Sequence, residues 1–343
     1  MTVATGEIVT IDPLFDDAGA AAMVDLCTRF GRYRLYSEHE KIEVDIGRGL
    51  AQRHDAVRNF LRTRGAGGAD ADEIAARTSY FREEYGYSGR PLIDGIEPFL
   101  ESPRLIDAAQ RVHDLPVIEP AIAYANLYLP GQELAVHTDV PEFRGANRKL
   151  LPQWLLVVMH HSGLFQEWYL PIATGIAYFH DAVGGALVYW PEGPDGEPKR
   201  HLPRANTAIV LDTDSVFHGV DPVGEAPGDV PKLAAGSSLV ALDDGGWVLR
   251  DARDEELRRY AAEELRFSVS WKAYCFGGEA ARDRWRAHSD DLTYEEIVAR
   301  LIGDLRSRGR IDGSTPEDDE LGLAMIDEYV RFPADDRPNV NAG

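Results

Sequence analysis

The stretch NLYLPGQELAVHTD (126–139) decides the fold of this chain, together with VFHGVDPV (216–223) far downstream. Alternate side chains of a β-strand share a face, so His137 and Asp139 point the same way if the first stretch is extended. His218 in the second stretch adds another imidazole. Two imidazoles and one carboxylate can hold one side of a metal ion and leave its other side open, which is typical of non-haem Fe(II) oxygenases.

Around these two stretches, from Pro116 to Phe276, short apolar runs alternate with turn residues and predict a block of β-strands. A hairpin turn is expected at Asp243-Asp-Gly-Gly246, which separates two apolar runs. Many short strands in one block indicate a sandwich or a jelly roll. The expected strands are 121–129, 133–140, 153–161, 168–179, 185–190, 206–212, 215–220, 238–242, 246–250 and 266–276.

The segments on either side of this block are predicted to be mostly helical, because apolar residues recur at helical spacing behind acidic starts. The expected helices are Ala18–Phe30, Asp70–Tyr85, Ile96–Val112 with an interruption at Pro103, Asp291–Arg306 and Pro316–Val330. We therefore expect a single α+β domain over 1–343, with a mainly β jelly-roll core at 120–276. Helical flanks are expected at 1–119 and 277–343.

The composition predicts a globular protein with a strongly acidic surface. The chain has 343 residues, 44% of them hydrophobic, and a formal net charge of -22. Such a field repels phosphate backbones and anionic membranes, so we expect neither nucleic acid nor a membrane as a partner. No apolar run approaches the ~18 residues of a membrane span, and the start has no signal-peptide pattern. The distant cysteines Cys27 and Cys275 favour a reducing cytoplasm.

Four motifs stand in order along the middle of the chain: NLYLPGQELAVHTD (126–139), GGALV (184–188), FHGVDPV (217–223) and RFSVSW (266–271). Together they resemble the Fe(II)/2-oxoglutarate-dependent oxygenase superfamily, and in particular its prolyl-4-hydroxylase-like branch. The resemblance covers roughly residues 120 to 276. It implies a double-stranded β-helix, which is a jelly roll, with His137, Asp139 and His218 as the iron ligands and the catalytic centre.

The resemblance also implies that Arg266 binds the distal carboxylate of 2-oxoglutarate, a role that suits the bidentate, permanently charged guanidinium. Ser268 shares its strand face and can donate a further hydrogen bond, while Tyr128 and Asn126 share a face of another strand and are expected at the same co-substrate. A structural salt bridge is the alternative role for Arg266, and Lys272 is the alternative anchor. In this superfamily the arginine anchor usually lies on the strand directly after the second histidine. Here an insertion at 224–265 separates His218 from Arg266. A charged stretch within this insertion, 254–264, is expected to be helical.

The reaction implied by the resemblance uses Fe(II), O2 and 2-oxoglutarate as co-substrate. It hydroxylates an unactivated C–H bond and releases succinate and CO2. Related halogenases lack the carboxylate ligand, so the presence of Asp139 favours hydroxylation. Desaturation and cyclisation use the same oxidant and stay open as alternatives.

The substrate is expected to be a small metabolite in a biosynthetic pathway, and we expect the pocket walls at Val140–Arg148 and at 224–265. Glu142, Phe143 and Arg144 supply one acid and one base that suit a zwitterion such as an amino acid, although a solvated loop would contain the same residues. A peptide or protein substrate is a second possibility. A non-catalytic jelly-roll binding protein is a third, and the sequence does not indicate an oligomeric state.

Overall fold

Two antiparallel sheets dominate the fold of the computed structural model, which describes residues 6–36, 42, 44–63, 78–224, 230–231, 233–312 and 316–334. Four core strands of the larger sheet lie in the order β12 (Thr207–Leu211), β9 (Ile172–Tyr178), β17 (Arg266–Phe276) and β5 (Val117–Tyr128). The smaller sheet has the order β11 (Lys199–His201), β10 (Leu187–Tyr189), β13 (His218–Val220) and β6 (Leu134–His137).

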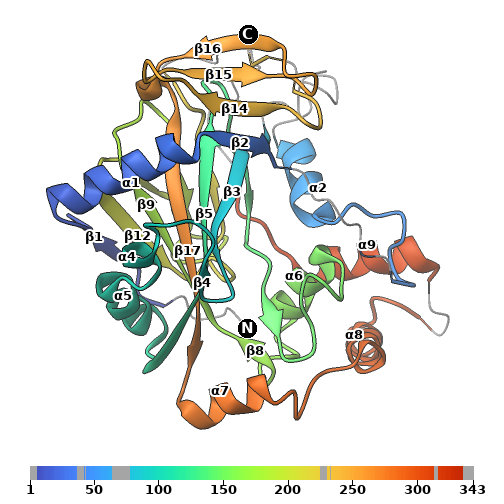
Figure 1. Ribbon diagram of the computed structural model, residues 1–343. Coiled ribbons are helices and arrows are strands. Elements are labelled where there is room, and N and C mark those ends of the chain that lie inside the picture. The colour runs from blue at the N-terminus through green and yellow to red at the C-terminus, as the bar shows by residue number, and fades with distance from the viewer. Residues whose placement is uncertain are drawn as a thin grey trace.

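The path of the chain through these strands defines a jelly roll. Along the sequence β5 lies in the larger sheet, β6 in the smaller, β9 in the larger, β10 and β11 in the smaller, β12 in the larger, β13 in the smaller and β17 in the larger. A chain that crosses repeatedly between two sheets of four strands is the eight-stranded jelly-roll arrangement. The predicted α+β fold with a jelly-roll core is therefore confirmed (Figure 1).

Strands from both the N-terminal flank and the insertion widen the larger sheet. Beyond β12 it gains β1 (Val9–Ile11), and beyond β5 it gains β3 (Phe81–Tyr87), β2 (Arg32–Leu35), β14 (Ser238–Ala241), β15 (Trp247–Arg250) and β16 (Glu256–Tyr260), while β4 (Arg90–Pro91) pairs with β3. The chain thus leaves the jelly roll after β13, adds three strands to the far edge of the sheet (Figure 1), and returns as β17. In the jelly roll itself, Arg266 begins the core strand that follows His218.

One helical prediction in the insertion was wrong, because part of 254–264 forms β16 and the rest includes a short 3-10 turn at Ala262–Glu264. Residues Glu256 to Arg259 are exposed, and Tyr260 is buried opposite Trp247 on β15. The hairpin between β14 and β15 is confirmed at the predicted turn. Charged residues that suit a helix also suit an edge strand, whose solvent side needs polar side chains.

Three helices cover the outer face of the larger sheet: α1 (Asp17–Phe30), α4 (Glu97–Leu100) and α5 (Pro103–His113) (Figure 1). The N-cap of α1 is Asp16, whose carboxylate accepts from the amide of Gly19, and Gly31 ends the helix with a φ of 82°. The predicted interruption before Pro103 is confirmed, because α4 ends at Leu100. These helices and the sheet share one hydrophobic core, in which Trp271 donates to the Leu100 carbonyl.

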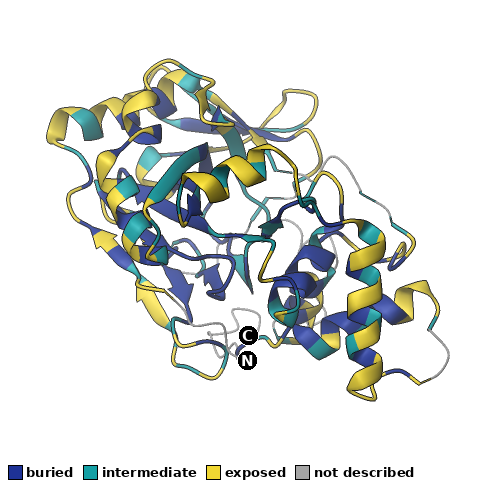
Figure 2. Cartoon of the chain, turned by 90° about the horizontal axis from the view of Figure 1, so that it is seen from below, coloured by how far each residue is buried: buried dark blue, intermediate teal, exposed yellow. Residues whose placement is uncertain are grey.

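A second core lies between the smaller sheet and helices from both halves of the chain. It contains α6 (Gln153–Ser162), α8 (Tyr294–Ser307) and α9 (Asp318–Tyr329), whose buried faces appear in Figure 2. The prediction of a strand at 153–161 was wrong, because this segment is α6. Residues 154–160 of α6 are all buried, and a run that is apolar on every side has no period from which helix and strand can be told apart.

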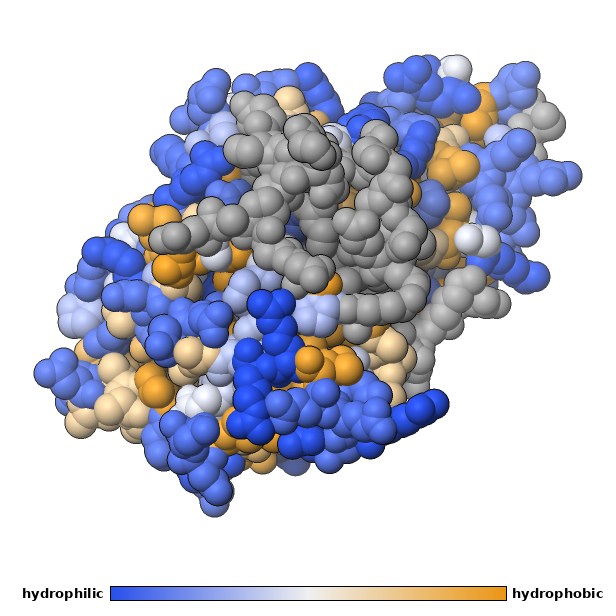
Figure 3. Space-filling view, turned by 90° about the horizontal axis from the view of Figure 1, so that it is seen from above, coloured by the Kyte–Doolittle hydropathy of each residue, from blue (hydrophilic) through white to orange (hydrophobic). Residues whose placement is uncertain are grey.

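The remaining elements include α2 (His54–Thr63), which contacts β6, as well as α7 (Glu279–Arg286), β7 (Glu142–Phe143) and β8 (Tyr169–Leu170). The helix predicted at Asp70–Tyr85 was wrong in its last part, where β3 begins, while residues 70–77 lie outside the described part of the chain. Both predicted C-terminal helices are confirmed as α8 and α9. None of the helices in the described ranges has the length and apolar character needed to cross a membrane. The described surface in Figure 3 is largely hydrophilic, with separate apolar patches.

Candidate active site

The smaller sheet brings the three predicted metal ligands together. His137 ends β6 and His218 begins β13, and the two residues are direct partners in the antiparallel register. Asp139 follows His137 by two residues, and its amide donates to the Thr213 carbonyl at 2.8 Å. The carboxylate Oδ1 lies 3.6 Å from Nε2 of His137 and 3.8 Å from Nε2 of His218. One nitrogen or oxygen from each residue lies within 4.8 Å of the others, so the predicted convergence is confirmed.

Backbone carbonyls orient both imidazoles for metal binding. Nδ1 of His137 lies 2.7 Å from the Ala135 oxygen, and Nδ1 of His218 lies 2.9 Å from the Val216 oxygen. A neutral ring that donates from Nδ1 keeps a lone pair on Nε2, and Nε2 is the atom directed at Asp139. Burial lowers the pKa of His218 to about 3, so this ring is neutral at ordinary pH.

Lys272 on β17 holds the third ligand. Its ammonium donates to Oδ2 of Asp139 at 2.7 Å, which leaves Oδ1 directed at the two imidazoles. Burial by itself would raise the pKa of Asp139, but Lys272 and the neighbouring imidazoles hold that pKa well below its usual range. Two imidazoles and one ionised carboxylate oxygen on one side of a cavity are a donor set that fits Fe(II).

An inner cavity of about 80 Å³ begins at these three residues and runs between the two sheets. The larger sheet contributes side chains from β5, β9 and β17, and the smaller sheet contributes side chains from β6, β10 and β13. The described residues in its wall are Tyr80, Tyr124, Asn126, Tyr128, Leu134, His137, Asp139, Thr174, Ile176, Leu187, Thr213, His218, Val220, Arg266, Ser268 and Ser270.

Arg266 is the buried cation of this inner cavity, with only 2% of its surface exposed. Its guanidinium donates to the Gly185 carbonyl at 2.7 Å, to Oγ of Ser268 at 3.1 Å and to the Tyr178 hydroxyl at 3.2 Å. All three partners are neutral, and no carboxylate of the described chain lies within ion-pair distance. Burying a charge without an opposite charge is costly, so this guanidinium indicates an anionic ligand.

Gly185, the second of the two glycines that precede β10, lies against Arg266. A Cβ at this position would lie 2.6 Å from Cδ of Arg266, and the residue has a φ of +63°. Only glycine allows both the backbone conformation and the close approach of the arginine. The GGALV motif is therefore tied physically to Arg266, which lies far from it in the sequence.

The other predicted co-substrate residues lie along the same wall. Arg266 pairs in register with Tyr128, and Ser268 pairs with Asn126, so both strands direct these side chains into the inner cavity. The Oδ1 atom of Asn126 is buried and has no hydrogen-bond partner in the described chain. The Arg266 guanidinium lies 5.1 Å from the centre of the Tyr128 ring.

Sequence reasoning missed the contribution of β9 to this wall. Thr174, Ile176 and Tyr178 alternate along the strand; Thr174 and Ile176 line the cavity, and Tyr178 holds Arg266. Every residue of β9 is buried, so the sequence offers no polar alternation to indicate which side faces the cavity. The two threonine hydroxyls of Thr174 and Thr213 bond each other at 2.6 Å.

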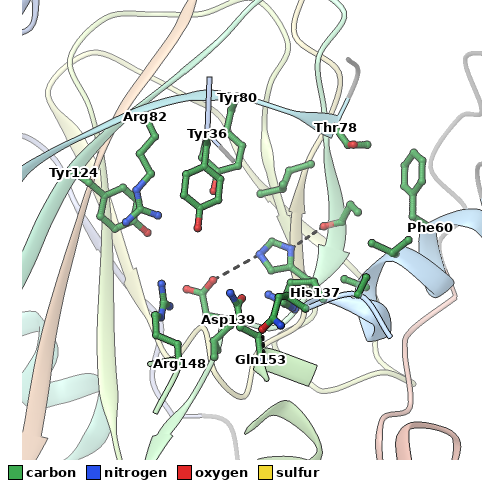
Figure 4. A pocket seen from close by; sticks show the side chains of 18 of the residues that line it. Tyr36, Phe60, Thr78, Tyr80, Arg82, Tyr124, His137, Asp139, Arg148 and Gln153 are labelled. Carbon is green, nitrogen blue, oxygen red and sulfur yellow. Dashed lines mark hydrogen bonds and ion pairs between the residues drawn. The ribbon is translucent and has the colours of Figure 1, made fainter. Parts of the chain in front are cut away.

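A larger outer cavity of about 420 Å³ adjoins the inner one at His137 and Asp139 (Figure 4). Its walls come largely from α2 and the residues just before it, from the segment that leads into β3, and from β5 and β6. Val140 and Arg148 line it, as predicted, whereas the described residues of 224–265 line neither cavity, so the prediction of a pocket wall there was wrong for them. The described wall residues are Tyr36, Ala51, Gln52, Arg53, Ala56, Val57, Phe60, Leu61, Thr78, Tyr80, Arg82, Ile122, Tyr124, Leu134, Ala135, His137, Asp139, Val140, Arg148, Gln153 and Lys272.

The three residues predicted to bind a zwitterion have structural partners and line neither cavity. Glu142 accepts from the Tyr274 hydroxyl at 2.8 Å, and Phe143 is buried in the second core. Arg144 binds the carboxylate of Asp290, with Nε 2.9 Å from Oδ1. These positions correct the earlier interpretation, because side chains that are bonded to Tyr274 and Asp290 or packed in the second core are unavailable to a ligand beside the metal ligands.

No protein-family model matches the sequence, and no curated protein matches it. The chain is similar to several solved structures. A prolyl-4-hydroxylase from Pseudomonas putida is 14% identical with a TM-score of 0.38, covering 80% of this chain and 95% of that one. A prolyl hydroxylase from Trichoplax adhaerens, in complex with a peptide fragment, is 12% identical with a TM-score of 0.41, covering 83% and 87%. HygX from Streptomyces hygroscopicus, with nickel, 2-oxoglutarate and hygromycin B bound, is 10% identical with a TM-score of 0.39, covering 79% and 84%.

Proposed function

We propose that this protein is a non-haem Fe(II) oxygenase. More specifically, it is an Fe(II)- and 2-oxoglutarate-dependent dioxygenase that hydroxylates an unactivated C–H bond of a small molecule and releases succinate and CO2. The observation that carries the proposal is one cavity with two ends. At one end His137, Asp139 and His218 converge, and at the other Arg266 is buried without an anionic partner in the described chain.

The chain's own residues prepare the metal site. Backbone carbonyls hold the Nδ1 protons of His137 and His218, so each Nε2 lone pair is directed at one point. Lys272 occupies Oδ2 of Asp139, so a single oxygen is left for the metal. Three ligands on one side leave the opposite side for 2-oxoglutarate and O2. When bound, the ferrous ion supplies the oxidising chemistry, driven by the oxidative decarboxylation of 2-oxoglutarate.

Arg266 orients the co-substrate in this proposal. Its fork binds the distal carboxylate, and the hydroxyls of Ser268 and Tyr178 keep the guanidinium in place. The buried Oδ1 atom of Asn126 has no hydrogen-bond partner in the described chain, so a hydrogen-bond donor is needed at this position of the inner cavity. Tyr128 covers the guanidinium with its ring and helps to exclude water. Because the two cavities share His137 and Asp139, a substrate in the outer cavity lies beside the metal site.

Hydroxylation is the proposed outcome because Asp139 occupies the ligand position that halogenases leave open. Desaturation or cyclisation is the runner-up and shares every residue named above. We also propose one functional unit for the whole described chain, because α2 of the N-terminal flank forms a wall of the outer cavity. A small molecule is the proposed substrate, since about 420 Å³ is within the range of small-molecule sites. A reducing, cytoplasmic location is proposed from the two buried free cysteines.

The test begins without a substrate. Purified protein is titrated anaerobically with Fe(II) and then with 2-oxoglutarate, and succinate is measured after O2 is added. We expect one Fe(II) per chain, 2-oxoglutarate binding that depends on iron, and slow uncoupled succinate formation. A protein that binds iron but forms no succinate under any condition would instead be a non-catalytic jelly roll.

The same protein then identifies the substrate and the outcome. A metabolite library is incubated with Fe(II), 2-oxoglutarate and ascorbate and analysed by mass spectrometry. A product heavier by one oxygen atom supports hydroxylation, and a product lighter by two hydrogen atoms identifies desaturation or cyclisation.

A further inference from the structure

Positive charge dominates the described wall of the outer cavity. Four cations line it, namely Arg53, Arg82, Arg148 and Lys272, and Asp139 is the one acid among the described wall residues. Lys272 neutralises Asp139, and Arg53 lies 3.2 Å from Asp55. Arg82 and Arg148 therefore leave the wall with an excess of positive charge, in a protein whose net charge is -22. A cavity of one sign concentrates ligands of the opposite sign.

Arg148 is the clearest indication of an anionic ligand. Its guanidinium has neither a hydrogen bond nor an ion pair with any residue of the described chain, and the residue is only half-buried. Figure 4 shows this side chain directed into the cavity, beside the carboxylate of Asp139. A guanidinium offers a planar fork of donors that matches carboxylate and phosphate groups.

Arg82 adds a positive charge that is fixed in place. Its guanidinium lies 3.6 Å from the centre of the Tyr124 ring and 5.1 Å from that of Tyr36. The Tyr36 ring stacks in turn on Tyr80, with 5.1 Å between ring centres. The only described carboxylate near Arg82 is Glu84, at 3.6 Å and largely exposed, where water screens the pair. Little side-chain entropy is lost when a ligand meets a cation that is already ordered.

The wall contributed by α2 is apolar. Ala56, Val57, Phe60 and Leu61 line the cavity from this helix. Val57 and Leu61 are large hydrophobic residues that are 46% and 47% exposed, although they belong to a cavity wall. Exposed apolar side chains gathered at one site indicate a surface that a ligand covers.

From these observations we infer that the outer cavity binds a small organic anion, whose carboxylate or phosphate group is held by Arg148 in the field of Arg82 and whose apolar part lies against α2. The inference rests on the proposed function, because it names the class of substrate for the same site. It disfavours amines, and it replaces the zwitterion suggested by the sequence. The anion lies on the open side of the metal site, so a C–H bond of the apolar part is within reach of the oxidant.

The experiment uses four probes that share one apolar body: octanoate, octyl phosphate, octanol and octylamine. Each is titrated by calorimetry into protein loaded anaerobically with Fe(II) and saturating 2-oxoglutarate, which keeps the probes out of the inner cavity. We expect octanoate or octyl phosphate to bind at least about tenfold more tightly than octanol and octylamine. Whichever of the two anions binds more tightly identifies the preferred head group, carboxylate or phosphate.

Arg148→Gln removes the proposed anchor, and Arg284→Gln is its matched control. Arg284 lies exposed on α7, outside both cavities, and has no ion pair with a described residue. We expect the preference for anions to disappear in R148Q and to persist in R284Q, with thermal unfolding verifying that both variants fold. Equal or tighter binding of octylamine, no measurable binding of either anion, or an unchanged preference in R148Q would overturn the inference.

The two proposals fail in different ways in this experiment. Loading with Fe(II) and 2-oxoglutarate is measured before any probe is added. Protein that loads normally but does not prefer anions overturns only the inference about the substrate. Protein that binds neither iron nor 2-oxoglutarate contradicts the proposed function before the probes are reached.

Discussion

The inner and outer cavities share five described wall residues, among them His137 and Asp139, yet they are built in opposite ways. The inner cavity, about 80 Å³, lies between the two sheets of the jelly roll, and hydrogen bonds within the chain hold its polar groups. The outer cavity, about 420 Å³, takes much of its wall from α2 and the approach to β3, which belong to the N-terminal flank. Under the proposed function, the jelly roll would determine the reaction, while the N-terminal flank together with Arg148 of the core segment would determine the substrate.

The contrast extends to the arginines of the two cavities. Arg266 makes three hydrogen bonds to neutral groups of the jelly roll, so its position is fixed before any ligand arrives. Arg148 has no such partner in the described chain, so its position depends on what enters. Variants that affect one cavity should therefore leave the other largely intact, and each prediction below tests this separation.

Removing one of the two metal-ligating imidazoles should have the largest effect on activity, because the reactions proposed for both cavities depend on the metal. We expect His137→Ala or His218→Ala to weaken Fe(II) binding by more than about 100-fold. Mutating a residue that only orients a metal ligand already lowers metal affinity about 10- to 100-fold, and removing a ligand itself should cost more. Uncoupled succinate formation should be abolished. Metal analysis and a succinate assay check this, with His288→Ala as the control at an exposed histidine. Normal iron binding in either variant would remove that histidine from the site.

Arg266→Ala should affect the inner cavity alone. We expect the dissociation constant of 2-oxoglutarate to rise by well over about tenfold, because truncating one partner of a buried charge pair costs roughly 2–5 kcal/mol. Fe(II) binding should change little, because Arg266 contacts none of the three ligands. Calorimetry with iron-loaded protein measures both. If the affinity for 2-oxoglutarate is unaltered, the anchor must be reassigned, with Lys272 as the first candidate.

Lys272→Met should have an intermediate effect, and it should weaken the binding of Fe(II) more than the binding of 2-oxoglutarate. The variant removes the donor to Oδ2 of Asp139 and leaves a buried carboxylate oxygen without its partner. We expect Fe(II) affinity to fall about 10- to 100-fold, as for other groups that orient a metal ligand. Competition with a coloured chelator measures the affinity. Loss of 2-oxoglutarate binding with unchanged iron affinity would show that Lys272 is the anchor and not a support for Asp139.

A polar substitution on α2 should have the smallest effect and should be confined to the outer cavity. Leu61 is 47% exposed, so Leu61→Gln should change the free energy of unfolding by less than about 0.5 kcal/mol. Binding of Fe(II) and 2-oxoglutarate should stay as in the wild type, while binding of octanoate weakens. Denaturant unfolding and calorimetry measure these quantities. A change in iron or co-substrate affinity would contradict the separation of the two cavities.

The sequence predicted several residues of the inner cavity, partly through the resemblance of the four motifs and partly through a local rule. His137 and Asp139 alternate along one stretch, and so do Arg266 and Ser268, so the period of a strand is sufficient to give each pair a common face. The insertion was harder, because its charges suit a helix or an edge strand equally. Its use as the outer part of the larger sheet depends on pairing with β2, which comes about two hundred residues earlier in the sequence.

Most of the outer cavity could not be predicted, apart from the wall at Val140 and Arg148, because its other walls are assembled from distant segments. Arg148 and Arg82 are ordinary charged residues in the sequence, and neither belongs to a motif. Segment 153–161 was assigned to the sheet because its run 154–159 is apolar and of strand length, whereas burial on every side accompanies its helical fold. For an apolar run without a helical or strand period, the packing of neighbouring elements decides whether it forms a helix or a strand.

From the sequence by itself, short apolar runs predicted the jelly-roll core, and strand alternation placed His137 and Asp139 on one face, since both are local properties. The resemblance of the four motifs to the oxygenase superfamily then supplied His218 and Arg266. Only the tertiary structure decided that Lys272 supports Asp139, that Glu142, Phe143 and Arg144 have structural partners away from the cavities, and that α2 lines a positively charged cavity. The physical reason is that charge compensation and burial depend on which groups meet in space, and pairing between distant strands and helices decides those meetings.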